Sequence, residues 1–170
     1  MRLKLILMGA CLLLATTLSY AQSTASNGRK ILKGKIEMKT LMNDSSMAWF
    51  YAGVNKYQPN DRMLAYIKDN RGKFTVVAIV GTFDDESRRL LPALYKIMIL
   101  AGSPDEQILT YGADEKLQTG TQVGYQTKKL PTFIVVRDGK ELGRISGDLE
   151  DTLEGDIAKI LLKANRKDKD

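Results

Sequence analysis

Apolar and polar residues along this chain follow two periods, one typical of strands and one typical of helices. Residues 74–80 form a nearly continuous apolar, β-branched run, which is typical of a strand buried on both faces. Residues 108–111 predict a second strand. Residues 132–136 and 141–145 flank the turn pair Asp138-Gly139, so they predict an antiparallel hairpin.

Apolar residues at helical spacing predict four helices around these strands, over residues 44–57, 60–70, 84–101 and 149–161. The third of these helices lies between the first two strands in sequence. The three elements therefore form a βαβ unit, for which a right-handed connection and parallel strands are expected. The predicted fold class is α/β.

The N-terminus differs from this central part. Residues 1–21 have a basic start, an apolar run over residues 5–18 and small residues at Ser19 and Ala21. This pattern predicts a secretory signal peptide cleaved after Ala21, and hence a periplasmic or extracellular protein. The apolar run is shorter than the roughly 20 residues of a membrane span, so no span is expected in the mature form. A lipoprotein signal ending at Cys11 is the alternative.

The remaining boundaries follow from composition. Residues 22–43 are mostly polar and predict a linker or N-terminal extension, with an edge strand near residues 36–39. Residues 44–163 form the predicted domain, and residues 164–170 a charged, frayed tail. A chain of 170 residues that is 44% hydrophobic can bury the core of one such domain.

Composition narrows the chemistry that this domain can perform. Cys11 is the only cysteine and the chain has no histidine, so cleavage after Ala21 would leave neither residue type. Thiol and imidazole nucleophiles, zinc sites of the Cys/His type and haem ligation are then excluded. We predict no cofactor and no metal. The net charge of +6 lies partly in the tail, and no nucleic-acid partner is expected.

Two proline positions connect the chain with a known family. Pro92 lies inside the predicted helix, eight positions after Asp84. Thioredoxins keep this separation between their first active-site cysteine and their helix-kinking proline. The segment Leu130-Pro131-Thr132 is similar to the cis-proline loop that faces the thioredoxin active site. The hairpin that follows is also similar to that of the family.

The chain therefore resembles exported thioredoxin-like proteins over roughly residues 49–162. The resemblance implies a thioredoxin-like three-layer α/β/α sandwich. Its expected features are a mixed central sheet, a C-terminal antiparallel hairpin and a final helix.

The active-site motif of the family is absent from the chain. The family's Trp-Cys-x-x-Cys falls on Phe83-Asp84-Asp85-Glu86-Ser87, so both cysteine positions carry oxygen. A carboxylate or a hydroxyl cannot form a disulfide. Ala78 also stands where many thioredoxins keep a buried acid. We therefore expect no thiol-disulfide oxidoreductase activity.

The acidic residues Asp84, Asp85 and Glu86 have a structural explanation, because negative charge and capping side chains stabilise a helix N-terminus. The alternative is a hard-cation site built from their carboxylates, although their spacing matches no EF-hand loop. Catalysis by paired carboxylates is disfavoured, because adjacent residues on one helical turn diverge.

In the family, the cis-proline loop binds an extended peptide, and that mode needs no sulfur. The positions that match this groove are Phe83, Leu130, Pro131, Thr132 and Gly147. The leading hypothesis is a non-catalytic module that binds a protein or peptide, with an unknown oligomeric state. One alternative is a degenerate relative of the oxidoreductases with another enzymatic or accessory role. Another is that Leu130-Pro131 persists only because the fold needs it.

Overall fold

The structure is a computed structural model that describes residues 23–167, so the predicted signal peptide and Cys11 lie outside the described residues. Two short 3-10 turns, at Ser45–Met47 and Asp105–Gln107, accompany the main elements. In chain order, these elements are β1 (Ser23–Thr24), β2 (Lys30–Ile31), β3 (Gly34–Ile36), α1 (Met38–Asn43), α2 (Ala48–Lys56), α3 (Asp61–Asp69), β4 (Thr75–Val80), α4 (Asp85–Leu100), β5 (Ile108–Gly112), β6 (Thr132–Arg137), β7 (Lys140–Ser146) and α5 (Leu153–Lys167).

The main sheet has five strands in the order β3-β5-β4-β6-β7. Strands β4 and β5 are parallel and joined through α4, which confirms the predicted βαβ unit. Strands β6 and β7 pair antiparallel around Asp138 and Gly139, which confirms the predicted hairpin. Strand β3 pairs antiparallel with β5 at the edge of the sheet. The class is therefore α/β with a mixed sheet.

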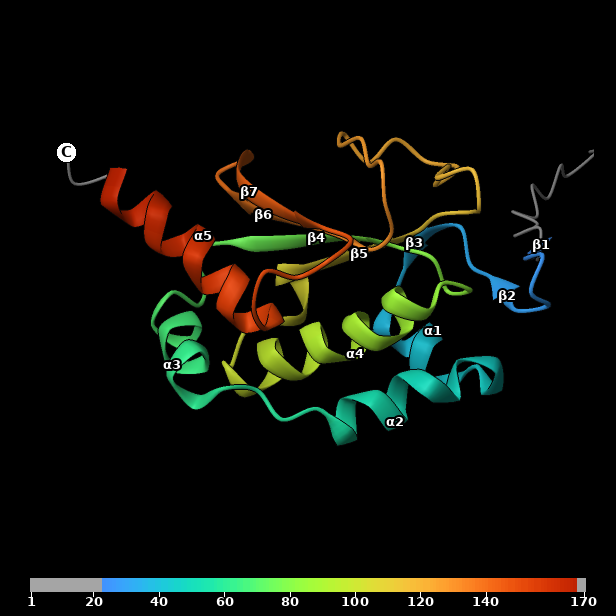
Figure 1. Ribbon diagram of the computed structural model, residues 1–170, viewed down its shortest axis with the longest axis horizontal. Helices are drawn as coiled ribbons and strands as arrows, with labels where there is room; N and C mark the ends of the chain where they lie inside the picture. The colour runs from blue at the N-terminus through green and yellow to red at the C-terminus, as the bar shows by residue number, and fades with distance from the viewer. Residues whose placement is uncertain (1–22, 168–170) are drawn as a thin grey trace, which may run out of the picture.

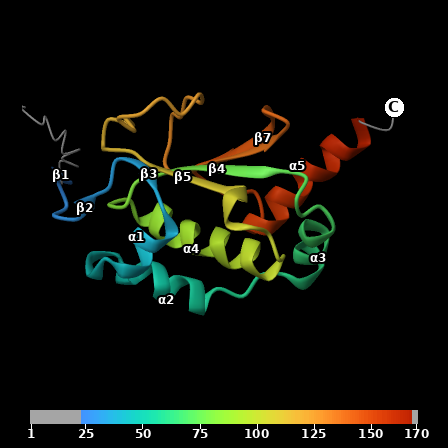
Figure 2. The same ribbon diagram turned by 180° about the vertical axis from the view of Figure 1, so that it is seen from behind.

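The five α-helices all lie on one side of this sheet (Figures 1 and 2). The larger core cluster contains residues from every one of them, packed against Val76, Ala78 and Val80 of β4. The opposite face of β4, with Val77 and Ile79, packs against no helix among the described residues. The expectation of helices on both faces is wrong for this chain, because the connection between β5 and β6 contains no helix.

That connection covers the second face as a loop over residues 113–131, which Figure 1 shows in orange above the sheet. Its half-buried side chains Val123, Tyr125 and Leu130 pack on the buried sheet residues. The sequence is too polar here to supply a helical apolar stripe. A few apolar side chains on an irregular backbone therefore shield this face.

Helix α2 lies against α4 on the side away from the sheet (Figure 1). The two helices approach most closely where a Cβ added to Gly53 would stand 2.5 Å from Cγ of Pro92. Pro92 is buried inside α4, as the sequence predicts. A glycine opposite the proline ring thus permits the close packing of these helices.

Several predicted boundaries need correction. The segment expected to be a linker carries β1, β2 and β3, and it continues into α1, which the sequence pattern did not predict. The last helix begins at Leu153 instead of residue 149, and it extends to Lys167, so most of the expected frayed tail is helical. Within residues 23–167, no helix has the length and apolar character needed to cross a bilayer.

Candidate functional site

The predicted site lies where β4 ends and α4 begins. Strand β4 is almost fully buried, and the turn of residues 81–84 carries the chain from its end into α4. Gly81 and Thr82 are buried in this turn, whereas Phe83 and Asp84 are half-buried. The polar groups of Phe83 and Asp84 therefore lie at the surface, next to the buried end of β4.

Asp84 and Ser87, the two residues that the resemblance aligns with cysteine, both form hydrogen bonds around the start of α4. Asp84 is the N-cap of α4, and its Oδ2 accepts a hydrogen bond of 2.7 Å from the Ser87 backbone N–H. The Ser87 side chain, whose residue is 1% exposed, accepts a 3.1 Å hydrogen bond from the Gly81 backbone N–H at Oγ. These contacts match the capping explanation of the acidic helix start.

The other two acidic residues point to separate basic partners. Asp85 is exposed, and its Oδ1 accepts a hydrogen bond of 2.6 Å from Nη1 of Arg29. Glu86 pairs with Arg89 one turn along α4, and this ion pair raises the pKa of Arg89. The three carboxylates therefore do not converge on one point, and no metal-holding group of three acidic or other ligating side chains occurs within residues 23–167.

Phe83 and Leu130 are both half-buried and lie near Gly81. A Cβ added to Gly81 would lie 2.8 Å from the Phe83 ring and 3.0 Å from Cδ1 of Leu130. The two side chains thus converge over Gly81, although they are 47 positions apart in sequence. One comes from the β4–α4 turn and the other from the loop before β6.

The Leu130–Pro131 peptide bond is cis, and the residues around it are tied together. The carbonyl oxygen of Pro131 accepts a hydrogen bond of 2.9 Å from the Gly147 backbone N–H. The hydroxyl of Thr132 is buried and hydrogen-bonds Ser146 at 2.9 Å and the carbonyl oxygen of Lys129 at 2.8 Å. Thr132 and Gly147 therefore hold the loop in place.

Leu130 itself lies outside β6, and its backbone N–H and C=O have no hydrogen-bond partner within residues 23–167. Its side chain is half-buried. The backbone groups that an extended segment would need are thus available at this residue.

Two basic residues that sequence reasoning missed also lie at the site. Nη1 of Arg29 donates to the Phe83 carbonyl oxygen at 2.8 Å, and Nδ2 of Asn27 donates to the same oxygen at 3.0 Å. Arg88 stacks on Trp49, with its guanidinium carbon 4.9 Å from the ring centroid. Burial and the nearby Arg29 lower the pKa of Arg88. The Asn27-Gly28 pair is a known hairpin signal and could have drawn attention to this segment.

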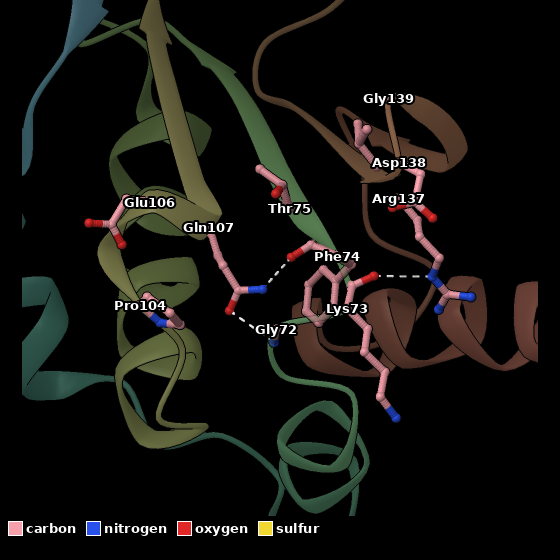
Figure 3. Close-up of a pocket in the computed structure, with 11 residues that line it drawn as sticks. Gly72, Lys73, Phe74, Thr75, Pro104, Glu106, Gln107, Arg137, Asp138 and Gly139 are labelled. Atoms are coloured by element: carbon pink, nitrogen blue, oxygen red, sulfur yellow. Dashed lines mark hydrogen bonds between the residues drawn. The ribbon is translucent and has the colours of Figure 1, made fainter.

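A separate cavity of about 630 Å³ lies at the opposite end of β4, lined by residues 72–75, 104, 106, 107 and 136–139. Figure 3 shows Glu106 and Asp138 on its two walls. The amide of Gln107 binds the Phe74 carbonyl oxygen at 2.5 Å and accepts from the Gly72 N–H at 3.3 Å. Its best-buried polar side chain is therefore already used to hold the neighbouring loops, and this cavity is remote from the predicted site.

Comparisons with protein-family models, curated proteins and solved structures found no match to this chain.

Proposed function

We propose that this chain is an exported thioredoxin-like module that lacks thiol-disulfide activity and binds an extended protein or peptide segment. Export rests on the pattern of residues 1–21. The parallel β4–α4–β5 unit, the antiparallel β6–β7 hairpin and the cis Leu130–Pro131 bond support the thioredoxin-like interpretation. The antiparallel β3 and the loop over the second sheet face depart from the expected pattern.

The absence of thiol chemistry follows from the two residues at the cysteine positions. Thiol-disulfide exchange needs a thiolate that attacks sulfur. Asp84 and Ser87 instead accept hydrogen bonds that stabilise the start of α4. Purified mature protein should therefore reduce insulin no faster than a blank without protein. Turnover above the blank would favour the alternative, an enzyme with an unrecognised reactive group.

The observation that carries the binding function is the Leu130 backbone beside two apolar side chains. Within residues 23–167 the Leu130 N–H and C=O have no hydrogen-bond partner, and the Phe83 ring and the Leu130 side chain both lie over Gly81. We call this surface the groove. An extended segment can add to such a backbone as a strand, with its side chains against Phe83 and Leu130. Binding of this kind needs neither sulfur nor a metal.

The test is a Leu130→Glu variant, panned in parallel with the wild-type chain against phage that display random extended peptides. A carboxylate at this half-buried position places an unpaired charge in the groove and should abolish peptide recovery. Leu162→Glu on α5 is the matched control, because Leu162 is 38% exposed and lies outside the groove. Equal recovery by wild type and Leu130→Glu, with Leu162→Glu also unchanged, would place the binding site elsewhere.

A further inference from the structure

A small hairpin formed by residues 23–31 lies beside the β4–α4 turn. Figures 1 and 2 show β1 and β2 at the same end of the molecule as the start of α4 and the loop over the sheet. The hairpin has two residues in each strand, and a turn closes it through a 2.9 Å hydrogen bond from the Ala25 N–H to the Arg29 carbonyl oxygen. We call this segment the N-terminal hairpin.

The turn of the N-terminal hairpin is bound to the groove at Phe83. The Phe83 carbonyl oxygen accepts from Arg29 at 2.8 Å and from Asn27 at 3.0 Å, which uses both of its lone pairs. The same Arg29 nitrogen donates to the Asp85 carboxylate at 2.6 Å. One guanidinium therefore joins a backbone carbonyl to a side-chain carboxylate at the end of the groove.

The other side of the hairpin is attached to the loop over residues 113–131. Glu115 accepts from the backbone N–H of Ser26 at 2.9 Å and from its hydroxyl at 2.5 Å. Lys33, just beyond the hairpin, pairs with Asp114 at 2.7 Å. The N-terminal hairpin thus spans from the β4–α4 turn to the loop that carries Leu130.

The contacts that hold the turn of the N-terminal hairpin are weak enough to break and re-form. An isolated two-stranded hairpin is only marginally stable in water. Within residues 24–31, only Ala25 and Ile31 are buried. The Asp85 side chain is 89% exposed, and ion pairs in water stabilise weakly. The buried Thr82 hydroxyl donates to the Lys30 carbonyl oxygen at 2.7 Å, so β2 stays attached while the turn of residues 25–29 opens without unfolding the domain.

We propose that the Phe83 carbonyl oxygen and the Asp85 carboxylate form an arginine subsite at the end of the groove, which the chain's own Arg29 fills until an arginine-bearing extended segment displaces it. Nη1 of Arg29 supplies both hydrogen bonds, and the planar guanidinium holds its N–H donors in fixed directions, whereas an ammonium rotates. Because the closed hairpin competes with the partner, the apparent affinity of the partner is reduced by the fraction of chains that are open. This inference rests on the proposed groove function.

The experiment opens the subsite and offers it a defined probe. The opened chain carries the two substitutions Asn27→Ala and Arg29→Ala. Synthetic peptides of residues 24–31 are titrated into it by calorimetry. One peptide has the natural sequence and the other carries Arg29→Ala. The natural peptide should bind about tenfold more tightly than its alanine counterpart, a difference of about 1.4 kcal/mol. It should bind the wild-type chain more weakly than the opened chain.

Arg71→Ala is the matched control, because it removes an exposed arginine from the turn after α3. The Arg71→Ala chain should bind the natural peptide with the same affinity as the wild-type chain. Equal binding of the two peptides, or tighter binding to wild type than to the opened chain, would overturn the arginine subsite.

Hydrogen exchange separates this inference from the groove function. The Ala25 and Ser26 amides donate to the Arg29 carbonyl and the Glu115 carboxylate in the closed hairpin, so the double variant should exchange them about tenfold faster than the Arg71→Ala control. Unchanged exchange would show that the hairpin does not close this site, whatever the groove binds. A third outcome combines faster exchange and tight binding of the natural peptide with no effect of Leu130→Glu on displayed peptides. That outcome would refute the groove function and support the arginine subsite.

Discussion

Replacing Asp84 and Ser87 by cysteine tests whether the β4–α4 turn has the geometry of a dithiol site. In the present chain the Ser87 backbone nitrogen lies 2.7 Å from Oδ2 of Asp84, so the Asp84 side chain already points towards Ser87. Cysteines at these positions would close a loop of four residues with an -x-x- spacing. All variants carry Cys11→Ser, which leaves no other thiol.

The expected change in the free energy of unfolding depends on the redox state. Loss of the Asp84 cap costs roughly 1 kcal/mol. Loss of the hydroxyl that accepts from Gly81 costs about another 1 kcal/mol, because sulfur is a weak acceptor. The reduced variant should therefore be about 2 kcal/mol less stable than the wild type. By the chain-entropy relation, a disulfide that closes a loop of four residues raises the free energy of unfolding by about 2 kcal/mol.

Urea unfolding with and without reductant measures this difference, and insulin reduction measures the regained chemistry. The oxidised double variant should match the wild type within about 1 kcal/mol, and the reduced form should reduce insulin above the blank. The single variants Asp84→Cys and Ser87→Cys are controls that should show no gap between redox states. If the disulfide fails to form, or forms without any insulin reduction, the thioredoxin-like interpretation of this turn is wrong.

Three further predictions concern stability. Gly53→Ala should destabilise by about 1–3 kcal/mol in urea unfolding, because its Cβ would stand 2.5 Å from the proline ring of α4, which outweighs a propensity gain of about 1 kcal/mol. Tyr57→Phe should cost about 1–3 kcal/mol, because it removes the 2.6 Å hydrogen bond to Glu154, which is 1% exposed. The hydrogen bond from Lys30 lowers the pKa of Asp44 from 3.8 to about 2, so this attachment of β2 stabilises above pH 3.8 and is lost as the pH falls towards 2. Titration of the Asp44 carboxyl carbon by NMR across that window checks it.

Much of the sheet and its main helix could be predicted because their signals are local. Strand β4 is a run of apolar residues long enough to be distinguished from a loop, and α4 has an acidic cap and an apolar stripe. The placement of the helices could not be predicted in the same way. Which face of a sheet a helix covers depends on packing between distant segments, and the polar stretch before β6 gave no sign that it would cover a face alone.

The residues of the candidate site also differ in whether their contacts are local enough to be predicted from the sequence. The capping role of Asp84 could be predicted, because its contact with the Ser87 N–H spans only three residues, whereas the hydrogen bond from Gly81 to Ser87 was not predicted. The meeting of Leu130 with the β4–α4 turn followed only from the family resemblance. Arg29 was missed because its contact with Phe83 spans 54 residues and it stands in a polar segment without apolar periodicity.

The proposed lack of thiol chemistry and the proposed arginine subsite involve different atoms of one turn. The Asp84 side chain accepts from the Ser87 N–H in α4, and the Ser87 side chain accepts from the Gly81 N–H in the turn before it. The groups that face the N-terminal hairpin are the Phe83 carbonyl and the Asp85 carboxylate. A carbonyl is present whatever residue stands at position 83, so the carboxylate at Asp85 is what makes the end of the groove selective for a cation. If the proposed subsite exists, the identity of residue 85, more than the absence of cysteine, therefore decides which segments it binds.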